Sequence, residues 1–312
     1  LRQSNEDVDW EKLLNYFEEL EYRTYENSAI AVTLVLCGER GRGDITDPIV
    51  QKILDPLAAS PHTYIRCSQR LKFIDLCEIG WSDVTETEAY GFHPEFLRPL
   101  VSILRPGEIG VHLNRHKDVI VVNEDGLLAA RRKGEWFLYD VATFKNCMGD
   151  ALGDYRVGCN IFEIVFDLSY KRCGALLVYD PNNKLSKKII NSDALLGLRT
   201  ISNKAREMIG PAVKHIPMGD RQRKNRKKRV FLELASLDGA TIFNKRRVIA
   251  FGAMVRLHAD AGSHAGARST AAHSAYSWGA YPIKISADGE ISVLFKSEGN
   301  NGESCLAELE FM

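Results

Sequence analysis

The sequence lacks an excess of charge, because 41 basic residues balance 41 acidic residues over 312 positions. A chain-wide attraction to nucleic acid or anionic membranes is therefore excluded, although a local basic patch is not. It also lacks a long apolar run: the longest, residues 28–37, falls well short of the roughly 20 residues of a membrane-spanning helix. No positively charged apolar leader opens the sequence, so nothing predicts secretion. We expect a cytoplasmic protein that does not enter a membrane.

The seven cysteines include no Cys-x-x-Cys pair, and their number is odd. Scattered cysteines of this kind predict free thiols in a reducing compartment. The tightest histidine pair, His112 and His116, has a spacing that holds a metal only on a helix. Because the flanking residues predict a strand, we expect no structural metal there.

What the sequence does contain is enough for two globular domains, with 45% hydrophobic and 26% charged residues. We expect an α+β accessory or sensor domain over residues 1–146 and an α/β domain over 147–312. The first domain is predicted to contain helices at 7–21 and 49–57, a buried strand at 29–37, and meander strands at 110–113, 119–122 and 135–139.

The second domain alternates helices and strands, which predicts a mixed sheet flanked by helices. Its expected helices span 160–172, 193–208 and 267–276. Its expected strands span 174–179, 230–235, 240–243 and 247–252, followed by a hairpin of 282–286 and 291–296.

One stretch of the second domain is strongly basic. Its seven cations are Arg221, Arg223, Lys224, Arg226, Lys227, Lys228 and Arg229. They form a candidate patch for nucleic acid or phosphate, and the only candidate for nucleic acid. Since no aromatic residue interleaves them for base stacking, we expect a solvated loop and no nucleic-acid partner.

Two polar segments stand where strands are predicted to end. Asp238-Gly239 is predicted as a tight turn between two strands, where a carboxylate suits a divalent metal or a hydroxyl group. The glycine would let a ligand approach the backbone, although Asp-Gly is also a common hairpin turn. The segment 286–289, Ser-Ala-Asp-Gly, predicts by itself only a turn.

A third polar segment, residues 262–272, is a glycine-containing loop that enters a helix. The first turn of that helix carries Arg268, Ser269 and Thr270. Helix-start amides, an arginine fork and two hydroxyl groups suit a phosphate. Serine and threonine also simply cap helices, so the alternative is a purely structural role.

The order of these motifs resembles the nucleotide-binding domain of diadenylate cyclases, the DisA-type (DAC) family. The resemblance covers about half of the chain, residues 147–299. It rests on the matching segments "LSYKRCGALL" (168–177), Asp238-Gly239-Ala240, "GARSTAA" (266–272) and Ser286-Ala287-Asp288.

The resemblance implies a nucleotide-binding, second-messenger signalling protein of bacterial type. In that family, two protomers meet face to face, each with one ATP and a divalent metal, and form cyclic di-AMP and pyrophosphate. Carried over, Asp238 would hold Mg²⁺ or Mn²⁺ or orient a hydroxyl group, with Asp288 as a second catalytic carboxylate. The residues that would contact the nucleotide are Gly239, Ala240, Gly266, Arg268, Ser269, Thr270 and Ser286.

The sequence departs from the family where charge is expected. Ser269 and Thr270 replace the histidine and second arginine of its Arg-His-Arg motif, and Ala287 replaces a glutamate of its Ser-Glu-Glu motif. Each lost charged contact costs about 1.5–3 kcal/mol, and preorganised charge supplies much of the rate of phosphoryl transfer. His264, His273 and the basic stretch are candidate replacements.

Three functions follow. The first is a DAC-like sensor of ATP or a cyclic dinucleotide with degenerate catalytic motifs. The second is an active diadenylate cyclase, which would work as a homodimer or higher homo-oligomer. The third is an α/β interaction protein whose motif matches are only turns and caps.

Overall fold

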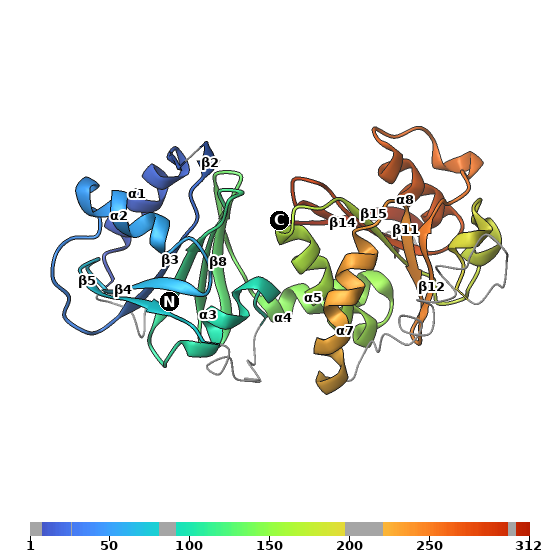
Figure 1. Cartoon of the computed structure of the whole chain (residues 1–312). Helices are drawn as coiled ribbons and strands as arrows, with labels where there is room; N and C mark the ends of the chain where they lie inside the picture. Colours follow the sequence, from blue (N-terminus) through green and yellow to red (C-terminus); the bar gives the residue numbers. More distant parts are fainter. Residues whose placement is uncertain (1–7, 26, 81–91, 197–220, 299–303) are drawn as a thin grey trace. The chain divides into compact units, whose positions relative to one another are not determined.

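The structure is a computed structural model that describes residues 8–25, 27–80, 92–196, 221–298 and 304–312 (Figure 1). The chain falls into two compact units, Leu1–Val141 and Ala142–Met312. The expected boundary at residue 147 lies inside α4 (Val141–Leu152). Each unit combines a mixed sheet with helices, so the chain belongs to the α/β class.

The first unit is built on a seven-stranded sheet of order β5-β4-β3-β6-β7-β8-β9. Strands β3 and β4 are parallel and flank α2 in sequence, whereas β6 to β9 form an antiparallel meander that contains the three predicted strands and one, β8, that was not predicted. The elements are β3 (Val32–Cys37), α2 (Pro48–Leu57), β4 (Thr63–Ser68), β5 (Phe73–Glu78), α3 (Arg98–Ile103), β6 (Ile109–Leu113), β7 (Val119–Asn123), β8 (Gly126–Arg132) and β9 (Glu135–Leu138).

Helix α1 (Trp10–Glu21) confirms the amphipathic helix predicted at the start of the chain. Asp9 caps it by accepting a hydrogen bond from the Lys12 amide at 3.1 Å. Leu13, Phe17 and Leu20 are buried in the core of this unit. A two-strand pair, β1 (Thr24–Tyr25) and β2 (Ser28–Ala29), separates α1 from β3.

The second unit contains a six-stranded sheet of order β12-β11-β10-β13-β14-β15. Strands β10 and β11 are parallel and the other neighbours are antiparallel, which confirms the predicted mixed sheet. Its elements are α5 (Tyr155–Tyr170), β10 (Ala175–Tyr179), α7 (Arg221–Ala235), β11 (Ala240–Phe243), β12 (Val248–Ala253), α8 (Ala267–Ser277), β13 (Tyr281–Ile285), β14 (Ile291–Glu298) and β15 (Ser304–Phe311).

Helices cover both faces of this sheet. On one face, Leu176 and Ile242 belong to a core that includes Ala275 of α8. On the other face, the Phe243 ring lies 6.4 Å from Phe231 of α7, and Phe311 lies 6.4 Å from Phe166 of α5. The unit therefore has three layers, with α8 on one face and α5 and α7, side by side in Figure 1, on the other.

The basic stretch is helical, so the predicted loop and the predicted strand at 230–235 are both wrong. Together they form α7, whose last turns bury Phe231 and Leu234. Lysine, arginine, leucine and glutamate are good helix formers. Lys228 is only 5% exposed because its ammonium lies 2.6 Å from Asp167 of α5. Within the described part of this stretch, Lys228 therefore contributes to the packing of α7 against α5.

Three other expectations also differ from the structure. The predicted helix at 193–208 starts as a short 3₁₀ turn, Ser192–Ala194, and Leu195 then pairs with Ala250; residues 197–208 lie outside the described ranges. Asp238-Gly239 connects α7 to β11, and not two strands. Strand β15 at the sheet edge was not predicted.

Candidate functional site

The pairing of three strands brings the predicted motifs to one end of the second sheet, the end at which β10 and β11 begin and β13 finishes. Leu176 pairs with Ala240 of the parallel strand β11, and Ala175 pairs with Ile285 of the antiparallel strand β13. Gly174 just before β10, Asp238-Gly239 just before β11, and Ser286 just after β13 therefore lie in a row.

Helix α8 begins at this same end. A Cβ atom placed on Gly174 would lie only 2.4 Å from Nη1 of Arg268, so the guanidinium group of Arg268 rests against the start of β10. We call Gly174, Asp238, Gly239, Ser286 and the first turn of α8 the Gly174 edge. The structure thus places Arg268, Asp238 and Ser286, which are far apart in sequence, at the same end of the second sheet.

The first turn of α8 offers unused hydrogen-bond donors. Gly266 is its N-cap residue, and no side chain caps the helix. The N–H groups of a first turn have no intrahelical acceptor, and they carry the positive end of the helix dipole. Among residues with described positions, neither the Arg268 guanidinium nor the Ser269 hydroxyl has a hydrogen-bond or ion-pair partner. These donors suit an anion such as phosphate.

Thr270 is less available than Ser269. Its hydroxyl group donates toward the carbonyl oxygens of Gly266 and His264, at 3.2 and 3.3 Å. Thr270 therefore holds the loop onto the start of α8, as the alternative structural interpretation predicts.

Asp238 is exposed, and only one of its carboxylate oxygens has a bond within the turn. Its Oδ1 accepts a hydrogen bond from the Gly239 amide at 3.0 Å. Gly239 has a φ of 94°, and a Cβ there would lie 2.6 Å from the carbonyl carbon of Gly252 in β12. The close approach that requires this glycine is therefore to a neighbouring strand, a cause the sequence does not reveal.

Ser286 and Asp288 lie in a turn on the other side of β10, where the Ser169 hydroxyl of α5 donates a hydrogen bond to the Gly289 carbonyl oxygen. The Ser286 hydroxyl bonds the Asp288 carboxylate, and the Gly289 amide donates to the Ser286 carbonyl oxygen at 3.1 Å. Because β10 stands between β11 and β13, the strands next to the Asp238 and Asp288 turns are two strand spacings, or ~10 Å, apart.

Ala240 differs from the other predicted site residues because its side chain is fully inside the core. It packs under α8 with Ala272 and Ala275. Its methyl group is therefore part of the apolar surface on which α8 packs, and only its backbone is near the Gly174 edge.

The donor set fits a metal only in the presence of a nucleotide. No cluster of three or more His, Cys, Asp or Glu side chains suited to a metal occurs in the described part of the chain. Mg²⁺ commonly keeps several waters and is bound by one or two carboxylates together with substrate phosphates. Asp238, with one free oxygen, could supply such a single carboxylate.

His264 and His273 lie near α8 but not beside Arg268. Their rings stack, with centroids 3.5 Å apart and an angle of 8° between their planes. Burial, and then the neighbouring His264, lowers the pKa of His273. Five residues along a helix rotate a side chain by roughly 140°, so His273 leaves α8 on a different flank from Arg268. The structure therefore does not bring this histidine pair together with Arg268.

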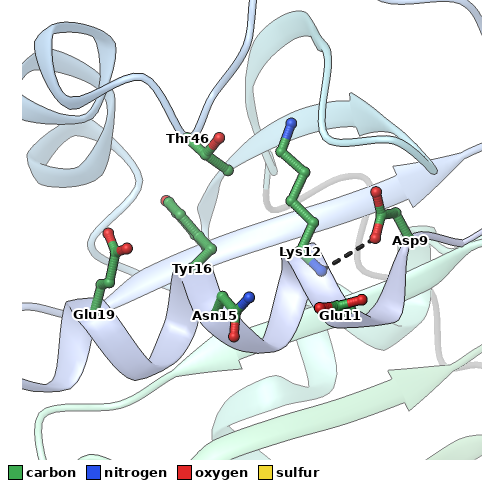
Figure 2. A pocket seen from close by; sticks show the side chains of 7 residues that line it. All are labelled: Asp9, Glu11, Lys12, Asn15, Tyr16, Glu19 and Thr46. Carbon is green, nitrogen blue, oxygen red and sulfur yellow. Dashed lines mark hydrogen bonds between the residues drawn. The ribbon is translucent and has the colours of Figure 1, made fainter.

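A separate cavity of about 390 Å³ lies in the first unit, and none of the predicted site residues line it. Figure 2 shows Lys12 and Tyr16 rising from α1 toward Thr46, with Asp9, Glu11 and Glu19 along the same helix. Lys12 is engaged, since its ammonium lies 2.5 Å from Asp44. The burial of Asp44 is outweighed by hydrogen bonds from Lys12, Thr46 and Lys72, which hold its pKa well below the usual range. This acidic cavity does not suit phosphate.

Comparison with solved structures gives 19 matching chains, and two of them show how weak the similarity is. A double cysteine mutant of DacA from Staphylococcus aureus is 18% identical, with a TM-score of 0.27, over 48% of this chain and 85% of the solved chain. A hypothetical membrane-spanning protein from Bacillus cereus is 16% identical, with a TM-score of 0.32, over 54% of this chain and 76% of the other. TM-scores this low do not establish a shared fold.

Sequence comparisons add no relative. No family model matches this chain, and no curated protein matches it. Over the ranges that the structure describes, none of the helices has the length and apolar character needed to span a membrane.

Proposed function

We propose that the second unit is a DAC-like sensor domain, which binds ATP or a cyclic dinucleotide at the Gly174 edge. One observation carries the proposal: the Arg268 guanidinium, unpaired among the described residues, lies against Gly174 at the same edge as the exposed Asp238. An unpaired arginine next to the uncapped start of a helix is suited to phosphate oxygens.

The geometry favours binding over rapid chemistry. Arg268 and the helix start supply positive charge, but the neighbouring positions carry only the hydroxyl groups of Ser269 and Thr270. Thr270 is occupied within the loop. A site with so few preorganised charges can hold a phosphate, but it offers little extra stabilisation to a transition state. The proposal is therefore a signalling role, in which a partner reads the bound state.

The alternative is an active diadenylate cyclase, and the free oxygen of Asp238 favours it. In this reaction the 3′-hydroxyl of each of two ATP molecules attacks the α-phosphate of the other, and two pyrophosphates leave. Bound Mg²⁺ or Mn²⁺ would neutralise the developing phosphate charge. Two copies of the chain would have to meet with their Gly174 edges facing each other.

Isothermal titration calorimetry of the full chain with ATP and Mg²⁺, and separately with cyclic di-AMP, tests the proposal. We expect binding of at least one of them, and a loss of about tenfold or more in Arg268→Ala, because a charge-assisted hydrogen bond contributes roughly 1.5–3 kcal/mol. Arg246→Ala is the matched control, since Arg246 is exposed in the β11–β12 turn at the opposite end of the sheet. Equal losses in both variants, or no binding by the wild type, would refute the site.

Incubation with ATP and Mn²⁺ or Mg²⁺, followed by mass spectrometry of the small molecules, separates the two functions. A sensor leaves ATP unchanged. A cyclase produces cyclic di-AMP, which disappears in Asp238→Asn. If a panel of nucleotides neither binds nor shifts the melting temperature, the chain is instead an interaction protein.

A further inference from the structure

Gly174 lies where no backbone conformation demands glycine. Its φ is outside the left-handed region, unlike that of Gly239. A Cβ on Gly174 would instead meet a side chain: its three nearest atoms are Nη1, Cζ and Nη2 of Arg268, at 2.4, 2.9 and 3.4 Å. The absence of a side chain at position 174 therefore makes room for one guanidinium group.

Nothing else fixes that guanidinium group among the residues that the structure describes. Arg268 has no ion pair and no hydrogen bond there, and it extends from the first turn of α8 across to the start of β10. Arginine has several rotatable bonds, so its position depends on the surface against which it rests. The bare α-carbon of Gly174 is that surface.

We propose that Gly174 is a positioning residue for Arg268: it seats the guanidinium group over the start of β10, beside the Asp238 turn, where a nucleotide phosphate would meet it. This inference rests on the function proposed above. A methyl group at position 174 would occupy the space next to the Gly174 α-carbon and displace the guanidinium group of Arg268. Because the displaced group is the far end of a flexible side chain, the fold is retained while the phosphate contact is lost.

A double-mutant cycle on the full chain tests this role. The variants are Gly174→Ala, Arg268→Ala and the two combined, titrated with ATP and Mg²⁺ by calorimetry, with each melting temperature measured. Gly38→Ala is the control, because no atom lies within 4 Å of a Cβ placed there. We expect Gly174→Ala to weaken binding about tenfold, the scale of a lost charge-assisted contact, with an unchanged melting temperature.

Coupling between the two positions is the decisive readout. In the Arg268→Ala background, Gly174→Ala is expected to cause no further loss, since no guanidinium group remains to be displaced. The same holds in an Arg268→Lys background, because an ammonium group lacks the planar fork that lies against Gly174. Gly38→Ala binds like the wild type.

The possible failures are distinguishable. If the wild type binds neither ATP nor cyclic di-AMP, the proposed function fails and the inference fails with it. If Arg268→Ala weakens binding but Gly174→Ala does not, or if their losses add fully, only the positioning role is overturned. A Gly174→Ala chain that does not fold would also overturn it, since position 174 would then be required by packing rather than by Arg268.

Discussion

Two buried titratable residues of the first unit, His112 and Asp55, have opposite effects on stability as the pH changes. His112 accepts or donates a hydrogen bond with Thr33 at 2.9 Å, and burial lowers its pKa to about 4. Burial raises the pKa of Asp55 to about 6, although a hydrogen bond from Tyr16 opposes the rise. Between pH 4 and 6 the native state therefore binds fewer protons than the unfolded chain at His112, and more at Asp55.

Asp55→Asn is expected to reveal the histidine contribution. A depressed histidine pKa adds stability that is lost as the pH falls from about 6.5 to 4, whereas a raised carboxyl pKa removes stability as the pH rises from about 4 to 6. The two largely cancel in the wild type. Without Asp55, the free energy of unfolding should rise by about 3 kcal/mol from pH 4 to pH 7. Urea unfolding at several pH values measures this, and a profile parallel to the wild type would contradict it.

Asp238→Asn tests the metal role of a single exposed residue. Asparagine can still accept the hydrogen bond from the Gly239 amide, so the melting temperature should not change. Removal of the negative charge should abolish the gain in ATP affinity that Mg²⁺ provides. Calorimetry with and without Mg²⁺ measures the difference, with Asp125→Asn in an exposed turn of the first unit as the control. An unchanged Mg²⁺ dependence would exclude Asp238 as a ligand.

At the scale of elements, α7 is fixed to α5 by a buried ion pair. The Lys228 ammonium lies 2.6 Å from Asp167 and 3.7 Å from Glu163, and Lys228 and Asp167 are both buried. Removing one partner of a buried ion pair typically costs about 3–5 kcal/mol.

Lys228→Ala should therefore destabilise the second unit by about that amount. Lys187→Ala, at an exposed lysine of the same unit, should have almost no effect. Guanidinium unfolding followed by circular dichroism compares the two variants. Equal stabilities would mean that the interaction between α5 and α7 does not depend on this pair.

The sequence pattern correctly predicted those helices and strands in which local conformational preference and tertiary packing favour the same structure. The strands at 174–179 and 240–243, the hairpin at 282–296 and the helix at 267–276 were predicted close to their observed bounds. The prediction of a strand at 230–235 was wrong, because a short apolar run is compatible with either a strand or a buried helix. Its helical state follows from tertiary contacts, such as Phe231 against Phe243, which the sequence does not display.

The candidate site was predictable only in part, for a related reason. The motif order located Asp238, Arg268 and Ser286, and strand register then explains why they share an edge. Gly174 was not predicted as a site residue, because its role depends on Arg268, which is distant in sequence. The side chain of Arg268 reaches Gly174 from the first turn of α8. Glycine in a strand signals such a close approach only in general terms.

At the scale of the whole molecule, the two units have separate cores. The first is centred on residues such as Leu34, Val111 and Phe17, and the second on Val178, Ile242 and Ala275. Each has its own candidate binding region: the acidic cavity at α1 in the first, and the Gly174 edge in the second. The central claim is that nucleotide binds to the second of these regions.

Hydrogen exchange of the full chain, measured by mass spectrometry with and without ATP and Mg²⁺, tests that claim most directly. The amides at the start of α8 have no intrahelical acceptor, so a bound phosphate should slow their exchange markedly. The account predicts protection of peptides that contain 238–240, 266–270 and 286–289, with no change in peptides from α1 or around Thr46. Protection confined to α1 and Thr46, or no protection anywhere in the chain, would contradict it.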